Sequence, residues 1–281
     1  MRYLLLLSLG LGGQQWTFPT IPAEKVTERL RRIERGENAA RFGTLGTLFT
    51  EAGCTGPALE PQMAKGSKVP NLVCTLPGEP EGKWILVTAH FDKVRAGAGA
   101  IDNWSGASLL PSLYQSLRAV EGRRHTFLFI GFTDEEAGLV GARAWVKANQ
   151  KTALKNVRAV INIDSVASGP HPLYVWASKA DPELTQLALQ MAGALKIPLE
   201  GMNADQVGTT DAAPFRAKKV PVIDFHSLNN QTWLWLHSID DQLSKIDVGA
   251  YQSAYRFLAA YLKFVDEKLD APDRSVTGAL K

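Results

Sequence analysis

Three apolar segments of the chain, each typical of a buried β-strand, end directly before acidic residues or a histidine. The segments and the residues that follow them are 84–89 with His90, 126–133 with Asp134, Glu135 and Glu136, and 159–163 with Asp164. Segments with helical periodicity separate them, and this alternation predicts a mostly parallel or mixed sheet with helices on both faces. Because such sheets collect functional residues at the carboxyl ends of their strands, we expect these side chains to meet in one site.

The rest of the chain completes the pattern of an α/β protein. Apolar periodicity predicts helices at 22–40, 42–52, 107–120, 138–149, 182–195 and 248–268, and further strands at 71–76, 173–177 and 221–225. Gly53 is placed to end the second helix, and the stretch 56–68, rich in proline and glycine, predicts a loop or hairpin connection. Since there is no internal repeat or clear linker, we expect residues 14–281 to form a single domain.

Composition and charge exclude several classes of function. Of the 281 residues, 45% are apolar and 21% are charged, which is ordinary for a globular protein with a sizeable core. The net charge of +3 is small and the basic residues are scattered, so we expect no nucleic-acid partner. No apolar run of the sequence reaches the length of a membrane span.

The first thirteen residues and the two cysteines bear on the location of the protein. Residues 1–13 combine Arg2, an apolar run and glycines, and so resemble a secretory signal peptide, which predicts a secreted or periplasmic protein. The alternatives are a buried amino-terminal strand and a cytoplasmic chain. Cys54 and Cys74 either form a disulfide that closes a loop of about twenty residues or stay as two half-buried thiols.

His90 and Asp92 form a His-x-Asp motif directly after a predicted strand. This spacing lets the imidazole bind a metal ion while the carboxylate orients the ring. Asp102 follows in a loop rich in glycine and alanine, and the two oxygens of one carboxylate can bridge two metal ions about 3.5–4 Å apart. Taken alone, Asp102 would more commonly cap a helix, and His90 would more commonly be a structural histidine.

Glu135 and Glu136 are adjacent carboxylates at the end of a strand, and their mutual repulsion calls for a nearby positive charge. A metal ion provides that charge if one glutamate binds it. The other glutamate can then take a proton from a metal-activated water and pass it to the leaving amine. The alternative is a solvated acidic turn, which is the role that we assign to Asp134.

Asp164 follows another strand, and His237 precedes Ser238 in a loop before the last helix. Both residue types are zinc ligands, although each residue alone would be an ordinary cap or surface residue. Among the other histidines, His226 follows a strand and is the alternative to His237 as a ligand.

In their order and spacing these motifs resemble the M28 family of zinc aminopeptidases over residues 71–263. The stretches that carry the resemblance are HFD, GAIDNWSGA, DEEAGLVGAR, NIDS, TDAAPF, VPVIDFHS and HSIDD. The resemblance implies a fold like that of zinc-dependent exopeptidases, with two zinc ions per chain. It also implies a cis peptide bond after Asp102.

The same resemblance implies a role for each site residue. His90 and Asp164 would be terminal ligands of one zinc ion, and Glu136 and His237 would be terminal ligands of the other. Asp102 would bridge the two ions. In the same way Glu135 would be the catalytic base, and Asp92 would orient the imidazole of His90.

The chain also departs from the family pattern. Many relatives have Ser-Asp-His where this chain has Thr210, Asp211 and Ala212, so any role of that histidine is absent. Three tryptophans near the site residues either line an apolar substrate pocket or pack in the core. These are Trp104, Trp233 and Trp235.

The resemblance implies a metallo-aminopeptidase that acts on peptides with a free amino terminus, through a zinc-activated water and Glu135 as general base. One alternative is a glutaminyl cyclase, which has a similar scaffold but uses one zinc ion and no water nucleophile. The AIDNWSGA and EEAGLVGAR contexts favour the peptidase. The other alternative is a non-catalytic binding domain on the same scaffold. Such a domain tends to lose ligands, whereas all five ligand positions are filled here.

Overall fold

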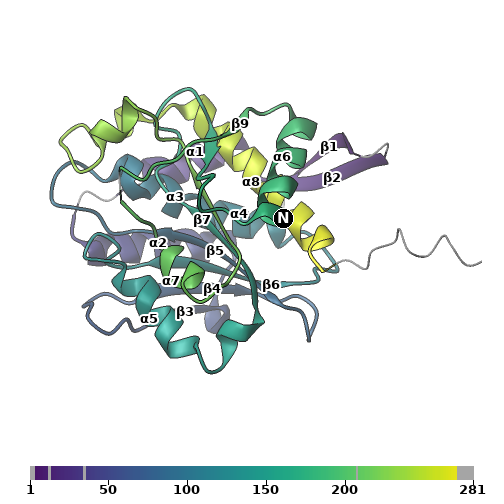
Figure 1. Ribbon diagram of the computed structural model, residues 1–281, viewed down its shortest axis with the longest axis horizontal. Helices are drawn as coiled ribbons and strands as arrows, with labels where there is room; N and C mark the ends of the chain where they lie inside the picture. Colours follow the sequence, from purple (N-terminus) through teal and green to yellow (C-terminus); the bar gives the residue numbers. More distant parts are fainter. Residues whose placement is uncertain (1–3, 12–13, 34–35, 207, 271–281) are drawn as a thin grey trace, which may run out of the picture.

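The computed structural model describes residues 4–11, 14–33, 36–206 and 208–270, which form an eight-stranded sheet between two layers of helices (Figure 1). The strand order is β3-β4-β6-β5-β7-β10-β8-β9. The strands are Leu59–Gln62 (β3), Asn71–Leu76 (β4), Trp84–His90 (β5), Thr126–Phe132 (β6), Val157–Ile163 (β7), Leu173–Val175 (β8), Leu199–Gly201 (β9) and Val222–His226 (β10). Neighbours β6, β5, β7 and β10 run parallel, so their carboxyl ends share one edge of the sheet. The prediction of a mixed α/β fold is confirmed.

Helices cover both faces of the sheet, as Figure 1 shows. The helices are Ala23–Arg31 (α1), Asn38–Ala52 (α2), Ser105–Ala107 (α3), Leu109–Leu117 (α4), Val140–Asn149 (α5), Pro182–Leu195 (α6), Ala213–Arg216 (α7) and Val248–Lys268 (α8), with short turns at Gly56–Ala58 (η1), Ala100–Trp104 (η2), Ala153–Asn156 (η3), Thr232–Trp235 (η4) and Leu243–Lys245 (η5). One apolar core lies under α5 and α7, and a larger one lies under α1, α2, α4, α6 and α8. Because both faces are covered, β5 and β6 are continuous apolar runs, not alternating ones.

Most sequence-predicted elements lie within a few residues of their observed positions, but one predicted helix was too long and several short elements were missed. The single helix predicted at 22–40 is wrong, because α1 ends at Arg31, Glu37 has an extended backbone and α2 begins at Asn38. The stretch 56–68, predicted as a loop or hairpin connection, contains β3, an edge strand that pairs antiparallel with β4. Pro61 is tolerated in β3 because β3 is an edge strand, but a proline in a sequence pattern argues against a strand. The short β9 and α7 were also missed.

The amino-terminal residues form a β-hairpin in which β1 (Leu5–Leu11) pairs antiparallel with β2 (Gln14–Thr20). The hairpin packs against α8, where the indole of Trp16 donates a hydrogen bond to Glu267 at 2.7 Å and Phe18 is fully buried. The signal peptide predicted at 1–13 overlaps β1 and stays a prediction; residues 1–3 and 12–13 lie outside the described part of the chain. Within that part, no helix has both the length and the apolar character needed to cross a bilayer.

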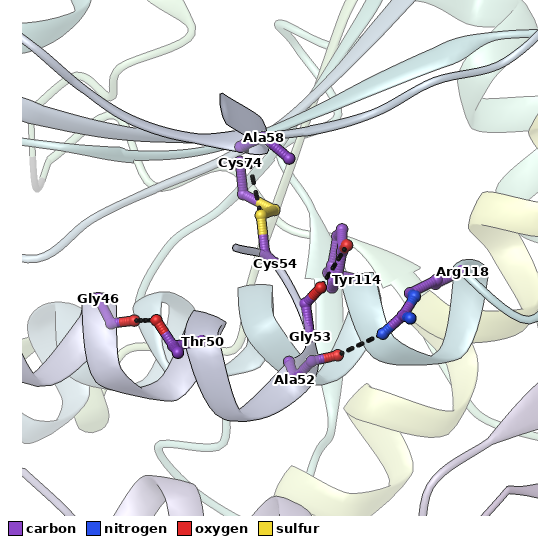
Figure 2. Close-up of a disulfide and its surroundings, with 9 residues drawn as sticks. All are labelled: Gly46, Thr50, Ala52, Gly53, Cys54, Ala58, Cys74, Tyr114 and Arg118. Carbon is purple, nitrogen blue, oxygen red and sulfur yellow. Dashed lines mark hydrogen bonds between the residues drawn. A yellow bond between two sulfur atoms is a disulfide. The ribbon is translucent and has the colours of Figure 1, made fainter. Parts of the chain in front are cut away.

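A disulfide joins Cys54, just after α2, to Cys74 in β4 (Figure 2). Both side chains are buried, and the alternative of two free thiols is wrong. The bridge ties the carboxyl end of α2 to the sheet. Gly53 precedes it with a φ of 93°, a left-handed conformation that ends the helix as the sequence predicted.

Candidate active site

The carboxyl edge of the parallel strands carries a pocket lined by six of the seven sequence-predicted site residues. These six are His90, Asp102, Glu135, Glu136, Asp164 and His237. His90 ends β5, Asp164 directly follows β7, and the two glutamates lie just after β6. Asp102 lies in η2, and His237 lies in the loop between η4 and η5. The strand order therefore brings together residues that are far apart in sequence.

The site residues form two groups that share Asp102. His90, Asp102 and Asp164 form the first group, and Asp102, Glu136 and His237 form the second; within each, one potential ligand atom per residue lies within 4.8 Å of the others. The Oδ1 atom of Asp102 is 3.0 Å from Nε2 of His90, whereas its Oδ2 atom is 3.2 Å from Nε2 of His237. The two oxygens of Asp102 thus face different groups, which is the geometry that a bridging carboxylate requires.

Asp92 lies beneath the pocket, almost fully buried. Its Oδ1 atom is 3.3 Å from Nδ1 of His90 and also accepts a hydrogen bond from the backbone N–H of Glu135 at 3.0 Å. Its Oδ2 atom accepts a hydrogen bond from the N–H of Glu136 at 3.2 Å. Asp92 is therefore placed both to orient the imidazole of His90 and to hold the turn that carries the two glutamates.

Opposite charges within the pocket shift the pKa values of His90 and His237 upward. Burial alone would lower the pKa of His90, but hydrogen bonds to Asp102, Asp164 and Asp92 outweigh it and raise the pKa well above its ordinary value. Hydrogen bonds to Asp102 and Glu136 raise the pKa of His237 to about 10. Burial would raise the pKa of Asp102, but the two histidines hold it well below its usual range. Both histidines thus interact directly with the carboxylate of Asp102.

Glu135 lies in the same pocket but belongs to neither ligand group. Burial raises the pKa of Glu135 to about 9; the proximity of His90 opposes this shift, and the negative charges of Asp211 and Asp164 add to it. Nearby cations invert this effect, because they stabilise the ionised carboxylate. Glu135 is thus a carboxyl group whose protonation depends on the local charge, as a proton-transfer group requires.

Sequence reasoning gave no role to Asp211, although the TDAAPF stretch that contains it was noted. Its side chain is 1% exposed, and neither carboxylate oxygen has a hydrogen-bond partner among the residues that the structure describes. Burial raises the pKa of Asp211 well above its usual value, and the neighbouring Asp92 and Asp164 add to that effect. No local pattern marks such a residue, because only the fold brings it close to the other carboxylates.

Asp241, the last residue of the HSIDD motif, was also missed. Its carboxylate accepts hydrogen bonds from the backbone N–H groups of Ile101 at 2.6 Å and Asp102 at 3.3 Å. Asn103 holds the other side of this turn, since its side chain donates to the carbonyl of Ile163 at 2.9 Å. The peptide bond between Asp102 and Asn103 is cis, as the family resemblance implied. Asp241 therefore connects the His237 loop to the turn that carries Asp102.

The structure decides two alternatives that the sequence left open, the role of His226 and the position of Trp104. The Nδ1 atom of His226 accepts a hydrogen bond from the N–H of Leu228 at 3.1 Å, so Nε2 carries the proton, and it lies 2.9 Å from the carbonyl of Met202. Neither ring nitrogen of His226 is left for a metal ion. Trp104 is fully buried in the core, and the tryptophan that lines the pocket is Trp176.

The residues present fit divalent cations. Imidazole and carboxylate groups are the donors that zinc accepts, with positions left open for water. The Oε1 atom of Glu136 is buried without a hydrogen-bond partner among the described residues, which is costly for a carboxylate unless a cation is near. Two donor groups joined through one aspartate match a two-cation centre.

The covered mixed sheet carries at its carboxyl edge an acidic, histidine-containing pocket whose residues fit divalent cations. The sequence profile described as peptidase family M28 matches residues 71–262, about two thirds of the chain. The chain belongs to this family.

Individual relatives agree with the family assignment. Leupeptin-inactivating enzyme 1 of Streptomyces exfoliatus is 28% identical over 187 residues, which are 66% of this chain and 39% of that protein. The chain thus spans less than half the length of the curated relatives that it matches first. Among solved structures, a zinc aminopeptidase from Bacillus subtilis has a TM-score of 0.62 at 24% identity, over 68% of this chain and 49% of that one.

A glutaminyl cyclase from Porphyromonas gingivalis also has the same fold. Its TM-score is 0.68 at 20% identity, and the match covers 86% of this chain and 98% of the cyclase. At such identities both solved structures establish the fold alone.

Proposed function

We propose that the chain is a two-zinc aminopeptidase that removes residues from the amino termini of peptides. In this proposal His90 and Asp164 would hold one cation, Glu136 and His237 would hold the other, and Asp102 would offer one oxygen to each. The observation that carries the proposal is the orientation of Asp102, whose two oxygens face different histidines at 3.0 and 3.2 Å. A site for one cation would need only one of the two groups that share Asp102.

Glu135 performs the proton transfers in the proposed reaction. When bound, the cations supply Lewis acidity at the scissile carbonyl and lower the pKa of water. Glu135 accepts a proton from the water whose oxygen attacks the carbonyl carbon. It then donates this proton to the peptide nitrogen as the carbon–nitrogen bond breaks, so that the leaving group departs as a neutral amine. Asp92 fixes the position of the turn that carries Glu135 and the orientation of the His90 ring, through the contacts described above.

The pocket fits the amino-terminal residue of a peptide. A free α-amino group is positively charged, and the carboxylates of the pocket would attract it. The remaining lining combines polar side chains such as Thr209 and Thr210 with the apolar side chains of Trp176, Phe225, Leu228 and Leu236. The apolar part of this lining favours an apolar side chain on the residue that is released.

A glutaminyl-peptide cyclase is the second candidate. The observation in its favour is the fold that the chain shares with the solved P. gingivalis cyclase over 86% of this chain. Against it stands the completeness of both histidine–carboxylate groups around Asp102. The aminopeptidase therefore remains the preferred function.

Product analysis separates the candidates. Purified, zinc-loaded protein would be incubated with a small panel of peptides, one of which begins with glutamine, and the products weighed by mass spectrometry. The aminopeptidase proposal expects loss of the amino-terminal residue, most rapidly when that residue is apolar. Loss of ammonia from the glutamine peptide alone would favour the cyclase. No change in any peptide, with zinc bound, would contradict both and favour a binding domain.

We also propose that the protein works outside the cytoplasm. The disulfide between Cys54 and Cys74 supports this, since such bonds persist mainly in oxidising compartments. Fractionation of the cells that make the protein, with thiols alkylated at lysis, would test it. A cytoplasmic protein with both cysteines alkylated would contradict the proposal.

A further inference from the structure

A buried arginine outside the ligand set lies beside the pocket. Arg41 is in α2, which precedes the segment matched by the family profile, and its side chain is 0% exposed. Burying a guanidinium group is costly unless acceptors surround it. The carboxylates of Asp92, Asp241 and Asp102 are close enough to interact with its charge. The position of Arg41 therefore calls for an explanation that the ligand set does not supply.

Arg41 donates hydrogen bonds to three backbone carbonyls of one loop. Its Nε atom donates to the carbonyl of Phe91, and its two terminal nitrogens donate to Ala98 at 3.0 Å and Gly99 at 2.9 Å. Phe91 directly follows His90, while Gly99 directly precedes the turn that contains Asp102. One rigid guanidinium group thus fixes both ends of the loop that connects the first histidine to the bridging aspartate.

Other contacts hold the same loop from the opposite side. The backbone N–H of Ala98 donates to the carbonyl of Asp241 at 2.7 Å. A side chain at Gly97 would place its Cβ atom 2.4 Å from the carbonyl oxygen of Ser238. The loop is therefore enclosed between Arg41 and the segment that follows His237, so that a shift at Arg41 moves ligands on both sides.

The helix that carries Arg41 is anchored at both ends. At its amino end, Asn38 donates to Asp134, next to the glutamate pair, at 3.2 Å. Beyond its carboxyl end, Figure 2 shows the disulfide and the hydroxyl of Tyr114, which donates to the carbonyl of Gly53 at 3.3 Å. These anchors make α2 a fixed base from which Arg41 can hold the loop.

We propose that Arg41 is a positioning residue that sets the separation of His90 and Asp102, and that cation affinity depends on its forked geometry. The inference rests on the proposed function, since it assumes that His90 and Asp102 bind a cation. Lysine at position 41 would keep the positive charge but would lose the planar fork that reaches separate carbonyls at once. The loop would then be held at fewer points.

The test compares Arg41→Lys with Arg29→Lys. Arg29 is a matched control, because it is also fully buried, but its hydrogen bonds go to Ser112 at 3.0 Å and Gln115 at 2.5 Å, both in α4. Zinc affinity would be measured by chelator competition, the Co²⁺-loaded proteins would be compared by visible absorption, and the zinc-free proteins would be melted. The melting curves report the general cost of changing a buried arginine.

We expect both variants to melt at similarly lowered temperatures without zinc. Only Arg41→Lys should bind zinc about ten- to a hundredfold more weakly, which is the usual effect of losing a residue that orients a metal ligand. Only this variant should also change the absorption spectrum of bound Co²⁺. Equal zinc affinities in both variants, or equal losses, would overturn the inference. If the unmodified protein bound no zinc, the proposed function would fail, and this inference with it.

A measurement on the unmodified protein covers the case in which Arg41→Lys does not fold. Because coupling is reciprocal, zinc binding should slow hydrogen exchange in α2 around Arg41 and in the 91–99 loop. The amides of α1 around Arg29 serve as the reference. Equal slowing in α1 and α2, or none in either, would overturn the inference.

Discussion

Replacing the two adjacent glutamates one at a time tests the proposed division between ligand and base. Glu135 belongs to neither ligand group, so Glu135→Gln removes the proton acceptor and leaves all five proposed ligands in place. We expect the variant to keep its zinc while kcat falls at least about a hundredfold, the usual contribution of a positioned general base. This factor corresponds to about 2.7 kcal/mol of activation free energy.

Glu136→Gln is the matched change, because it makes the same substitution one residue further along. The Oε2 atom of Glu136 is 2.9 Å from Nε2 of His237, and its Oε1 atom is buried without a partner among the described residues. We therefore expect this variant to lose zinc, from two ions per chain towards one. Metal content after dialysis and initial rates at saturating zinc would be measured for both variants. Loss of zinc from Glu135→Gln, or its turnover at the unmodified rate, would refute the reasoning.

Three further outcomes follow from the structure. His237→Ala should lower zinc content and His226→Ala should not, because both nitrogens of His226 are engaged by the backbone; the opposite pattern in metal analysis would show that the ligand was misassigned. Replacing Cys54 and Cys74 by alanine should lower the free energy of unfolding by roughly 3 kcal/mol, which is the value for a closed loop of this length. Calorimetry should then show a melting point lower by roughly 5–10 °C. An unchanged melting point would contradict this expectation. Zinc binding at pH 7 should release protons, because the pKa values of His90 and His237 are raised and a histidine must be neutral to bind zinc. Zinc affinity should therefore rise as the pH is raised towards about 10. Titration calorimetry in two buffers measures the released protons, and no release would count against the assignment.

The elements that place the site were predictable, because their pattern is local. Apolar runs before His90, Glu135 and Asp164 predicted strands, and parallel strands share one carboxyl edge. In the observed sheet, β6, β5 and β7 are neighbours and run parallel. The long helix predicted at Val248–Lys268 was correct to the residue.

The supporting residues were not predictable in the same way. Arg41 lies outside every recognised motif, and the motifs that contain Asp211 and Asp241 do not reveal what these two residues do. Each of the three acquires its role from contacts across the fold. The sequence left open whether Trp104 lines the pocket or packs in the core for the same reason. Its burial depends on tertiary packing against α1, to whose Leu30 carbonyl its indole donates a hydrogen bond. Local sequence identifies ligand types, whereas tertiary contacts identify what holds them in place.

The central claim, that one aspartate bridges two cations, can be tested by diffraction from zinc-soaked crystals at the zinc absorption edge. We expect two anomalous peaks about 3.5–4 Å apart, one on each side of the Asp102 carboxylate, with His90 beside one peak and His237 beside the other. A single peak, or peaks that do not contact Asp102, would contradict the claim.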